Sequence, residues 1–218
     1  MVFSNSRKLS LSGWLQENDI VAYNSPLKLQ KFLFFYEALS KINNEETDFT
    51  KLKGYQRGPV FSQVWGDYTK DRKEFDEKSK TAYNSGDEDV NQTRARRAKM
   101  IVNSLSENEL SLLTHQFHIW DKKKTRIMGG EQQVELEEQD FDEDDILLTQ
   151  NLERMFPDEI VDNYVSIVIG DKCFLFSKED CNRLSAQHFD ILTELSKNAD
   201  LHNPVYVEIE ADGRLCLD

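Results

Sequence analysis

Two histidines three residues apart, His115 and His118, are the side chains of this sequence whose spacing first suggests chemistry. On one face of a helix such a pair can bind a metal ion together with an acidic or cysteine ligand. The sequence provides no third ligand in a recognisable metal-binding pattern around them. We therefore expect no metal site and no cofactor.

The other reactive side chains form no recognisable catalytic motif. The sequence contains no Gly-rich phosphate loop, no Gly-x-Ser-x-Gly turn and no His-Glu-x-x-His helix. Two of the 40 acidic residues could meet as a general acid and base, but so many acids make a chance pair expected. We expect a protein that is not an enzyme, with an unrecognised hydrolase or nuclease as the less favoured alternative.

Cysteine usage and hydropathy indicate a compartment. The three cysteines, Cys173, Cys181 and Cys216, are an odd number without a Cys-x-x-Cys pair, which argues against a disulfide framework and a zinc ribbon. The first residues lack an apolar run of signal length, and no apolar run approaches the ~20 residues of a membrane span. We expect a cytoplasmic protein with reduced thiols and no membrane partner.

Charge is distributed unevenly along the chain. Residues 1–130 contain 21 basic and 17 acidic side chains, whereas residues 131–218 contain 6 and 23. An acidic surface favours a basic protein partner and repels nucleic acid, although a high net charge also simply keeps a protein soluble. The basic run Arg94, Arg96, Arg97 and Lys99 could contact nucleic acid, but no aromatic residues interleave with it. We favour an ordinary helix surface there and expect no nucleic-acid partner.

The stretch 24–68 contains 9 of the 23 aromatic side chains, and we expect it to organise the rest of the chain. Ser25 can cap a helix that begins at Pro26, where the missing N–H costs nothing. Nearly every position up to Leu39 is apolar, which predicts a helix enclosed by its neighbours. The residues expected to be buried at its centre are Leu29, Phe32, Leu33 and Tyr36.

A second helix is expected to begin at Gly58-Pro59-Val60. Gly58 can adopt backbone angles closed to other residues, and Pro59 suits a first helical turn. Before it, residues 51–56 are too few and too basic for a helix and are expected to run extended. The apolar stripe of this second helix would be Val60, Phe61, Val64, Trp65 and Tyr68.

These segments resemble the Panacea (SocA-like) antitoxin domain. The resemblance lies in Leu29-Gln30-Lys31-Phe32 through Tyr36, then a short extended piece, then Gly58-Pro59-Val60 through Tyr68. It covers about residues 10–120. The family often closes with a Thr-His segment followed by a Trp after a loop. Here Thr114-His115 falls within an expected helix and Trp120 follows only five residues later, so that motif is not carried over.

The resemblance implies a function and a contact surface. Domains of this class neutralise toxins by binding them, so we expect the antitoxin of a toxin–antitoxin pair whose partner is a protein toxin with a basic surface. A phage-encoded or mobile-element adaptor is the nearest non-enzymatic alternative. The residues expected to contact the partner are Lys31, Arg57, Gly58, Pro59, Val60, Trp65 and Tyr68. The alternative for the Gly58-Pro59 turn is a purely structural corner.

The rest of the chain completes an expected α+β architecture. Residues 10–125 are expected to form a mainly helical domain, after a loose arm over 1–11 and with a capping box at Ser106. Residues 126–145 read as a basic and glycine-rich, then acidic, linker whose end becomes the start of a helix. Residues 146–218 are expected to form a smaller acidic α+β unit, with hairpins at 164–176 and 204–217 around a helix.

Overall fold

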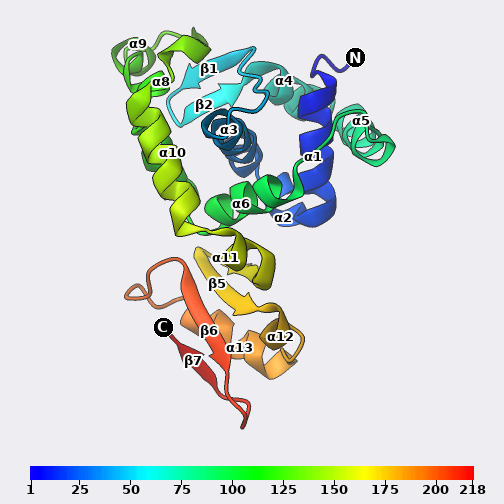
Figure 1. Cartoon of the computed structure of the whole chain (residues 1–218), viewed down its shortest axis with the longest axis vertical. Helices are drawn as coiled ribbons and strands as arrows, with labels where there is room; N and C mark the ends of the chain where they lie inside the picture. Colours follow the sequence, from blue (N-terminus) through cyan, green and yellow to red (C-terminus); the bar gives the residue numbers. More distant parts are fainter.

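The computed structural model describes all 218 residues and has the expected α+β architecture, with a helical N-terminal part and a small C-terminal sheet (Figure 1). The helices before residue 104 are α1 (Ser6–Asn18), α2 (Ile20–Asn24), α3 (Pro26–Ile42), α4 (Ser62–Lys70), α5 (Arg72–Ser85) and α6 (Gln92–Asn103). The later helices are α7 (Glu107–His115), α8 (His118–Asp121), α9 (Lys124–Met128), η1 (Glu138–Asp140, 3-10), α10 (Glu143–Met155), α11 (Asp158–Asn163), α12 (Lys178–Cys181) and α13 (Ala186–Leu195). No helix is both long and apolar enough to cross a membrane.

Helix α3 is the central helix of the fold, as predicted. Figure 1 shows it end-on, surrounded by α1, α6, α10 and the β1–β2 hairpin. Ser25 caps it and Pro26 occupies its first turn. Its residues Leu29 to Ser40 are all buried, because neighbouring elements cover every face of the helix. The four residues expected at the centre, Leu29, Phe32, Leu33 and Tyr36, are at most 1% exposed.

The expected loose arm over residues 1–11 is wrong, because α1 begins at Ser6. The side chain of Asn5 caps this helix, and the Asp67 carboxylate accepts hydrogen bonds from the N–H groups of Phe3 and Ser4. Lys8 is buried and pairs with Glu37 on α3. Buried charges anchor this segment, so an apolar pattern could not reveal it.

A three-stranded sheet packs against the side of α3 (Figure 1). Its strands β1 (Leu52–Tyr55), β2 (Gly58–Phe61) and β3 (Val134–Glu135) are antiparallel in the order β2-β1-β3. The expected extended run before Gly58 is therefore confirmed, but the helix start at Gly58-Pro59 is wrong. Helix α4 begins only at Ser62. Pro59 is tolerated in β2 because an edge strand has N–H groups that need no ladder partner.

The segment 126–145, expected as a linker, packs onto this sheet. Its apolar side chains Val134, Leu136 and Phe141 are buried in the main core. Basic residues of the helical part pair with its acids, as Lys41 does with Glu138 at 2.7 Å. The expected helix after it is α10, which packs on α3.

The C-terminal unit is a four-stranded sheet. Its strands are β4 (Tyr164–Ile169), β5 (Lys172–Ser177), β6 (Val205–Ile209) and β7 (Leu215–Leu217), in the order β4-β5-β6-β7. Both predicted hairpins are present, and β5 and β6 pair in parallel across the helical connection. Leu192 of α13 is buried, whereas Phe189 and Ile191 of the same helix are 43% and 41% exposed.

Candidate functional site

A pocket of about 670 Å³ opens between the N-terminal half of α3 and the β1–β2 hairpin. Helix α3 and the hairpin contribute Pro26, Leu27, Gln30, Lys31, Gly54, Tyr55, Gln56, Arg57 and Val60. The remaining lining residues come from α4, α7 and the segment around α9, and are Trp65, Glu107, Ile127, Gly130, Glu131, Gln132 and Gln133. Elements distant in sequence therefore build one recess beside the central helix.

Lys31 is the most unusual side chain of this pocket. It is 1% exposed, and its Nζ donates one hydrogen bond, to the carbonyl oxygen of Pro59 at 3.3 Å. It takes part in none of the ion pairs of the structure. Burial and the like charge of Arg57 hold the pKa of Lys31 well below its usual value. An ammonium group without a carboxylate partner is costly to bury.

The hairpin turn encloses this lysine. Gly58 has a φ of +102°, and a Cβ atom built on it would lie 2.4 Å from Lys31 Nζ and 2.4 Å from Thr114 Oγ1. The expected need for glycine at this position is therefore real, although it serves a hairpin and not a helix. Any side chain here would collide with the buried lysine.

Gln30, beside Lys31 on α3, holds the end of β2. Its Oε1 accepts a hydrogen bond from the N–H of Phe61 at 2.8 Å. Its Nε2 is buried and has no hydrogen-bond partner. The pocket thus includes a second residue with an unused donor.

The two acids that line the pocket are bound to other groups. Glu107 pairs with Arg57 at 3.1 Å and accepts a hydrogen bond from the Ser25 hydroxyl at 2.7 Å. Glu131 pairs with Arg126. Neither carboxylate neutralises Lys31.

An aromatic pair supports the far side of the hairpin. The rings of His115 and Trp120 stack with centroids 3.8 Å apart, and Trp120 Nε1 donates to the Tyr55 carbonyl oxygen at 3.0 Å. Burial, and then the charge of Lys31, lower the pKa of His115. Neutral His115 is therefore part of the packing around the hairpin.

Of the seven residues expected to contact a partner, four line the pocket: Lys31, Arg57, Val60 and Trp65. Gly58 and Pro59 are buried beside Lys31 and form the start of β2, so they do not line the pocket themselves. Tyr68 does not belong to the site. It is 6% exposed and donates a hydrogen bond to the carbonyl oxygen of Tyr23 at 3.0 Å.

The family's closing Thr-His and Trp motif is not carried over from the sequence, because Thr114-His115 falls within an expected helix and Trp120 follows only five residues later. The structure ends α7 at His115 and begins α8 at His118, so a break separates the histidine from the tryptophan. Thr114 and His115 then face the hairpin together with Trp120. The presence of a Thr-His pair followed by a Trp was the sequence signal that could have predicted this contact with the hairpin.

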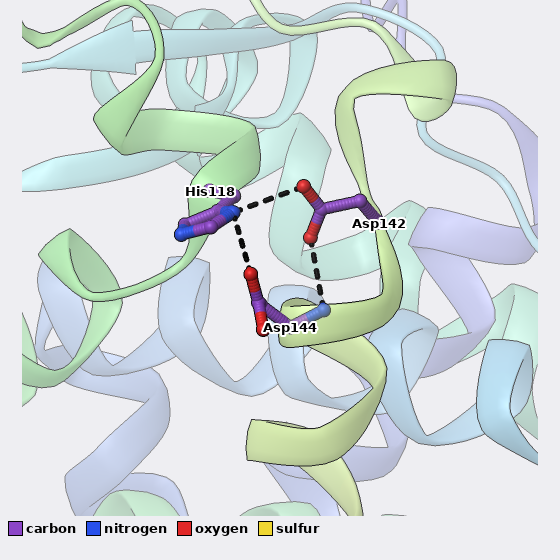
Figure 2. Close-up of side chains that lie close together, drawn as sticks. All are labelled: His118, Asp142 and Asp144. Carbon is purple, nitrogen blue, oxygen red and sulfur yellow. Dashed lines mark hydrogen bonds and ion pairs between the residues drawn. The ribbon is translucent and has the colours of Figure 1, made fainter.

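The second histidine, His118, lies in a different cluster (Figure 2). Its Nδ1 is 2.9 Å from Asp142 Oδ2 and 3.4 Å from Asp144 Oδ2, at the start of α10. The Lys122 ammonium binds the same Asp142 oxygen at 2.8 Å. These ion pairs join α8 to α10. His115 and His118 do not share a face, so the spacing that suggested a joint metal site is misleading.

The three arginines of the basic run on α6 are paired with acids of the same chain. Arg94 pairs with Glu45, Arg96 with Asp162 at 2.6 Å, and Arg97 with Glu153 and Asp158. These arginines join α6 to its neighbours.

Comparisons with family models, with curated proteins and with solved structures give no match, so the Panacea resemblance stays a prediction from the residues quoted above.

Proposed function

We propose that this protein is the antitoxin of a two-protein toxin–antitoxin pair and that it inactivates its toxin by direct contact. One observation carries the proposal. Lys31, Val60 and Trp65, from the two segments that resemble the Panacea domain, line one pocket together with Arg57, although up to 34 residues separate them. A recess lined by the residues that carry a family resemblance is a reasonable binding site for that family's ligand.

The chemistry of the pocket supports recognition of a partner. Its lining contains no serine, cysteine or histidine that could serve as a paired nucleophile and base. It combines apolar walls with polar groups, and Trp65 at 37% exposure and Arg57 are of the types that dominate protein interfaces. The toxin would cover the hairpin and insert a group into the recess.

The acidic C-terminal unit supplies a second element of the proposal. Residues 146–218 contain 14 acidic and 6 basic side chains. This surface would attract a basic toxin and accelerate the encounter, while the pocket would provide the specific contact.

Co-expression with the neighbouring gene tests the function. Expression of the adjacent reading frame alone should arrest growth, and co-expression of this protein should restore it. The two proteins should then copurify. Trp65→Ala should abolish both effects, whereas Leu112→Ala, which removes another exposed apolar side chain far from the pocket lining, should retain them. An adjacent gene product that is harmless when expressed would contradict the antitoxin function.

A further inference from the structure

The pocket beside α3 contains more hydrogen-bond donors than acceptors can satisfy. A lysine ammonium has three donors, and Lys31 uses one of them, in a long bond to Pro59. Gln30 Nε2 uses neither of its two. Both residues are 1% exposed and line the pocket, so a group that enters the pocket is what can reach them. Buried polar groups in folded proteins are nearly always paired, and a ligand with an acceptor oxygen would pair with these donors.

The lining of the pocket contains no free acid to supply that acceptor. Glu107 and Glu131 line the pocket but pair with Arg57 and Arg126. The charged side chain whose electrostatic interaction lowers the pKa of Lys31 is Arg57, which is also basic. Within the recess, Lys31 is therefore the basic side chain without an acidic partner, and an incoming anion would supply one.

The walls restrict what kind of anion fits. Leu27, Val60, Trp65 and Ile127 give the recess an apolar surface. A volume of about 670 Å³ lies within the range of pockets that hold a small molecule or a few side chains. A free inorganic anion would leave these walls uncovered. A carboxylate attached to an apolar group would use both the donors and the walls.

We propose that this pocket binds a carboxylate carried next to an apolar side chain of a partner protein, with Lys31 and Gln30 as its hydrogen-bond donors. That the partner is a toxin rests on the proposed function. The binding chemistry rests on the pocket alone. The carboxylate can belong to an acidic side chain or to the end of a polypeptide chain, and the test separates these sources.

Titration of the full-length ¹⁵N-labelled protein with three small probes tests the proposal. N-acetyl-phenylalanine presents a chain-terminal carboxylate, N-acetyl-phenylalanyl-glutamate amide a side-chain carboxylate, and N-acetyl-phenylalanine amide none. At least one carboxylate probe should shift the Trp65 indole signal and bind ten or more times tighter than the amide. The tighter of the two carboxylate probes identifies the source of the group.

Two variants assign the effect to the lysine. Lys31→Met removes the ammonium but keeps an unbranched side chain one atom shorter, and it should reduce the tenfold preference for a carboxylate to near unity. Lys28→Met removes a lysine one turn earlier on α3 that does not line the pocket, and should leave the preference unchanged. Lys31→Gln, which keeps a polar side chain, is the replacement if the methionine variant does not fold.

The result that overturns the proposal is equal binding of the amide, no binding of any probe, or an unchanged preference in the Lys31 variants. These outcomes are independent of toxin neutralisation. A harmless neighbouring gene product with intact carboxylate binding would remove the antitoxin function and keep the pocket chemistry. Neutralisation by Lys31→Met, which lacks carboxylate binding, would keep the function and remove the proposed toxin contact.

Discussion

The Nζ atom of Lys31 occupies the space in which a side chain at Gly58 would begin, 2.4 Å from the position of a Cβ atom there. The central helix and the β1–β2 hairpin can therefore meet in this way only because residue 58 is a glycine. The same contact buries the lysine and shapes the pocket that Lys31 lines. Stability and the shape of the pocket consequently depend on the same pair of residues.

Gly58→Ala is expected to lower the free energy of unfolding by about 3 kcal/mol, because it adds left-handed backbone strain to a steric collision. Gly86→Ala is the matched control, since Gly86 also has a positive φ (+69°) but no heavy atom within 4 Å of its Cβ position. The control should lose only about 1 kcal/mol. Urea denaturation of both variants measures the difference, and equal losses would mean that Lys31 moves away without cost.

Lys31→Met is expected to raise the free energy of unfolding by roughly 1–3 kcal/mol near neutral pH, because it removes a buried and unpaired charge. The folded-state pKa of Lys31 lies well below 10.5, so between these two values the unfolded chain binds more protons than the folded chain. Wild-type stability therefore rises with pH in this window, and the advantage of the variant should shrink toward pH ~10. Denaturation curves of both proteins across this pH range measure the difference in their free energies of unfolding. A difference that grows with pH would contradict the prediction.

Glu37 is the second buried charge of α3, and this one is paired. It is fully buried and accepts hydrogen bonds from Arg7 at 2.9 Å, from Lys8 and from the N–H of Asp48 at 3.1 Å. Glu37→Gln should cost about 3–5 kcal/mol, because it leaves the Lys8 ammonium buried without its main partner. The exposed ion pair of Arg214 provides a control, and Arg214→Gln should cost under about 0.5 kcal/mol.

A double variant separates the lost pair from lost packing. Glu37→Gln with Lys8→Met removes both charges and should lose less than the sum of the two single variants. Additive losses in thermal or urea unfolding would show that the two side chains stabilise the fold independently.

Asp142 is expected to control the titration of His118. The hydrogen bond and charge of Asp142 raise the pKa of His118 above its usual 6.5. A raised histidine pKa stabilises the fold below the unfolded value, and the stabilisation is lost as pH rises through the folded value. The His118 side chain is 39% exposed, so the loss above pH ~6.5 should be only a few tenths of a kcal/mol. An NMR titration in which Asp142→Asn leaves the pKa of His118 unchanged would refute this.

Arg57→Glu is expected to abolish toxin binding while changing stability by less than about 0.5 kcal/mol. Arg57 is 55% exposed and its pair with Glu107 lies at the surface, where ion pairs contribute little. Copurification with the toxin and a thermal melt measure the two effects, with Arg214→Glu as an exposed charge reversal distant in sequence. Unchanged binding would identify Arg57 as an ordinary surface residue.

Local signals in the sequence were sufficient for the elements whose ends and faces depend on nearby residues. Ser25-Pro26 and the apolar surface that follows predicted α3 and its burial, because caps and helical periodicity act within a few residues. The capping box at Ser106 and both C-terminal hairpins were predicted for the same reason. These signals need no knowledge of the remainder of the fold.

Gly58-Pro59 could not be assigned in this way, because a proline suits a first helical turn and an edge strand equally well. The antiparallel pairing of β2 with β1 places these two residues in a strand and not in a helix. The same limit applies to the start of α1, where the side chain of Asn5 caps the helix and Lys8 pairs with the buried Glu37 of α3.

For the candidate site, too, the sequence predicted some features and the tertiary structure determined others. The residue types of Lys31, Arg57 and Trp65 were visible in the sequence, and the resemblance selected them. That Lys31 is buried without an acid, that Gln30 has a free donor and that Tyr68 points elsewhere depend on which segments pack against α3. The burial and partners of a charge are set by contacts between residues far apart in the chain, and only the tertiary structure decides those.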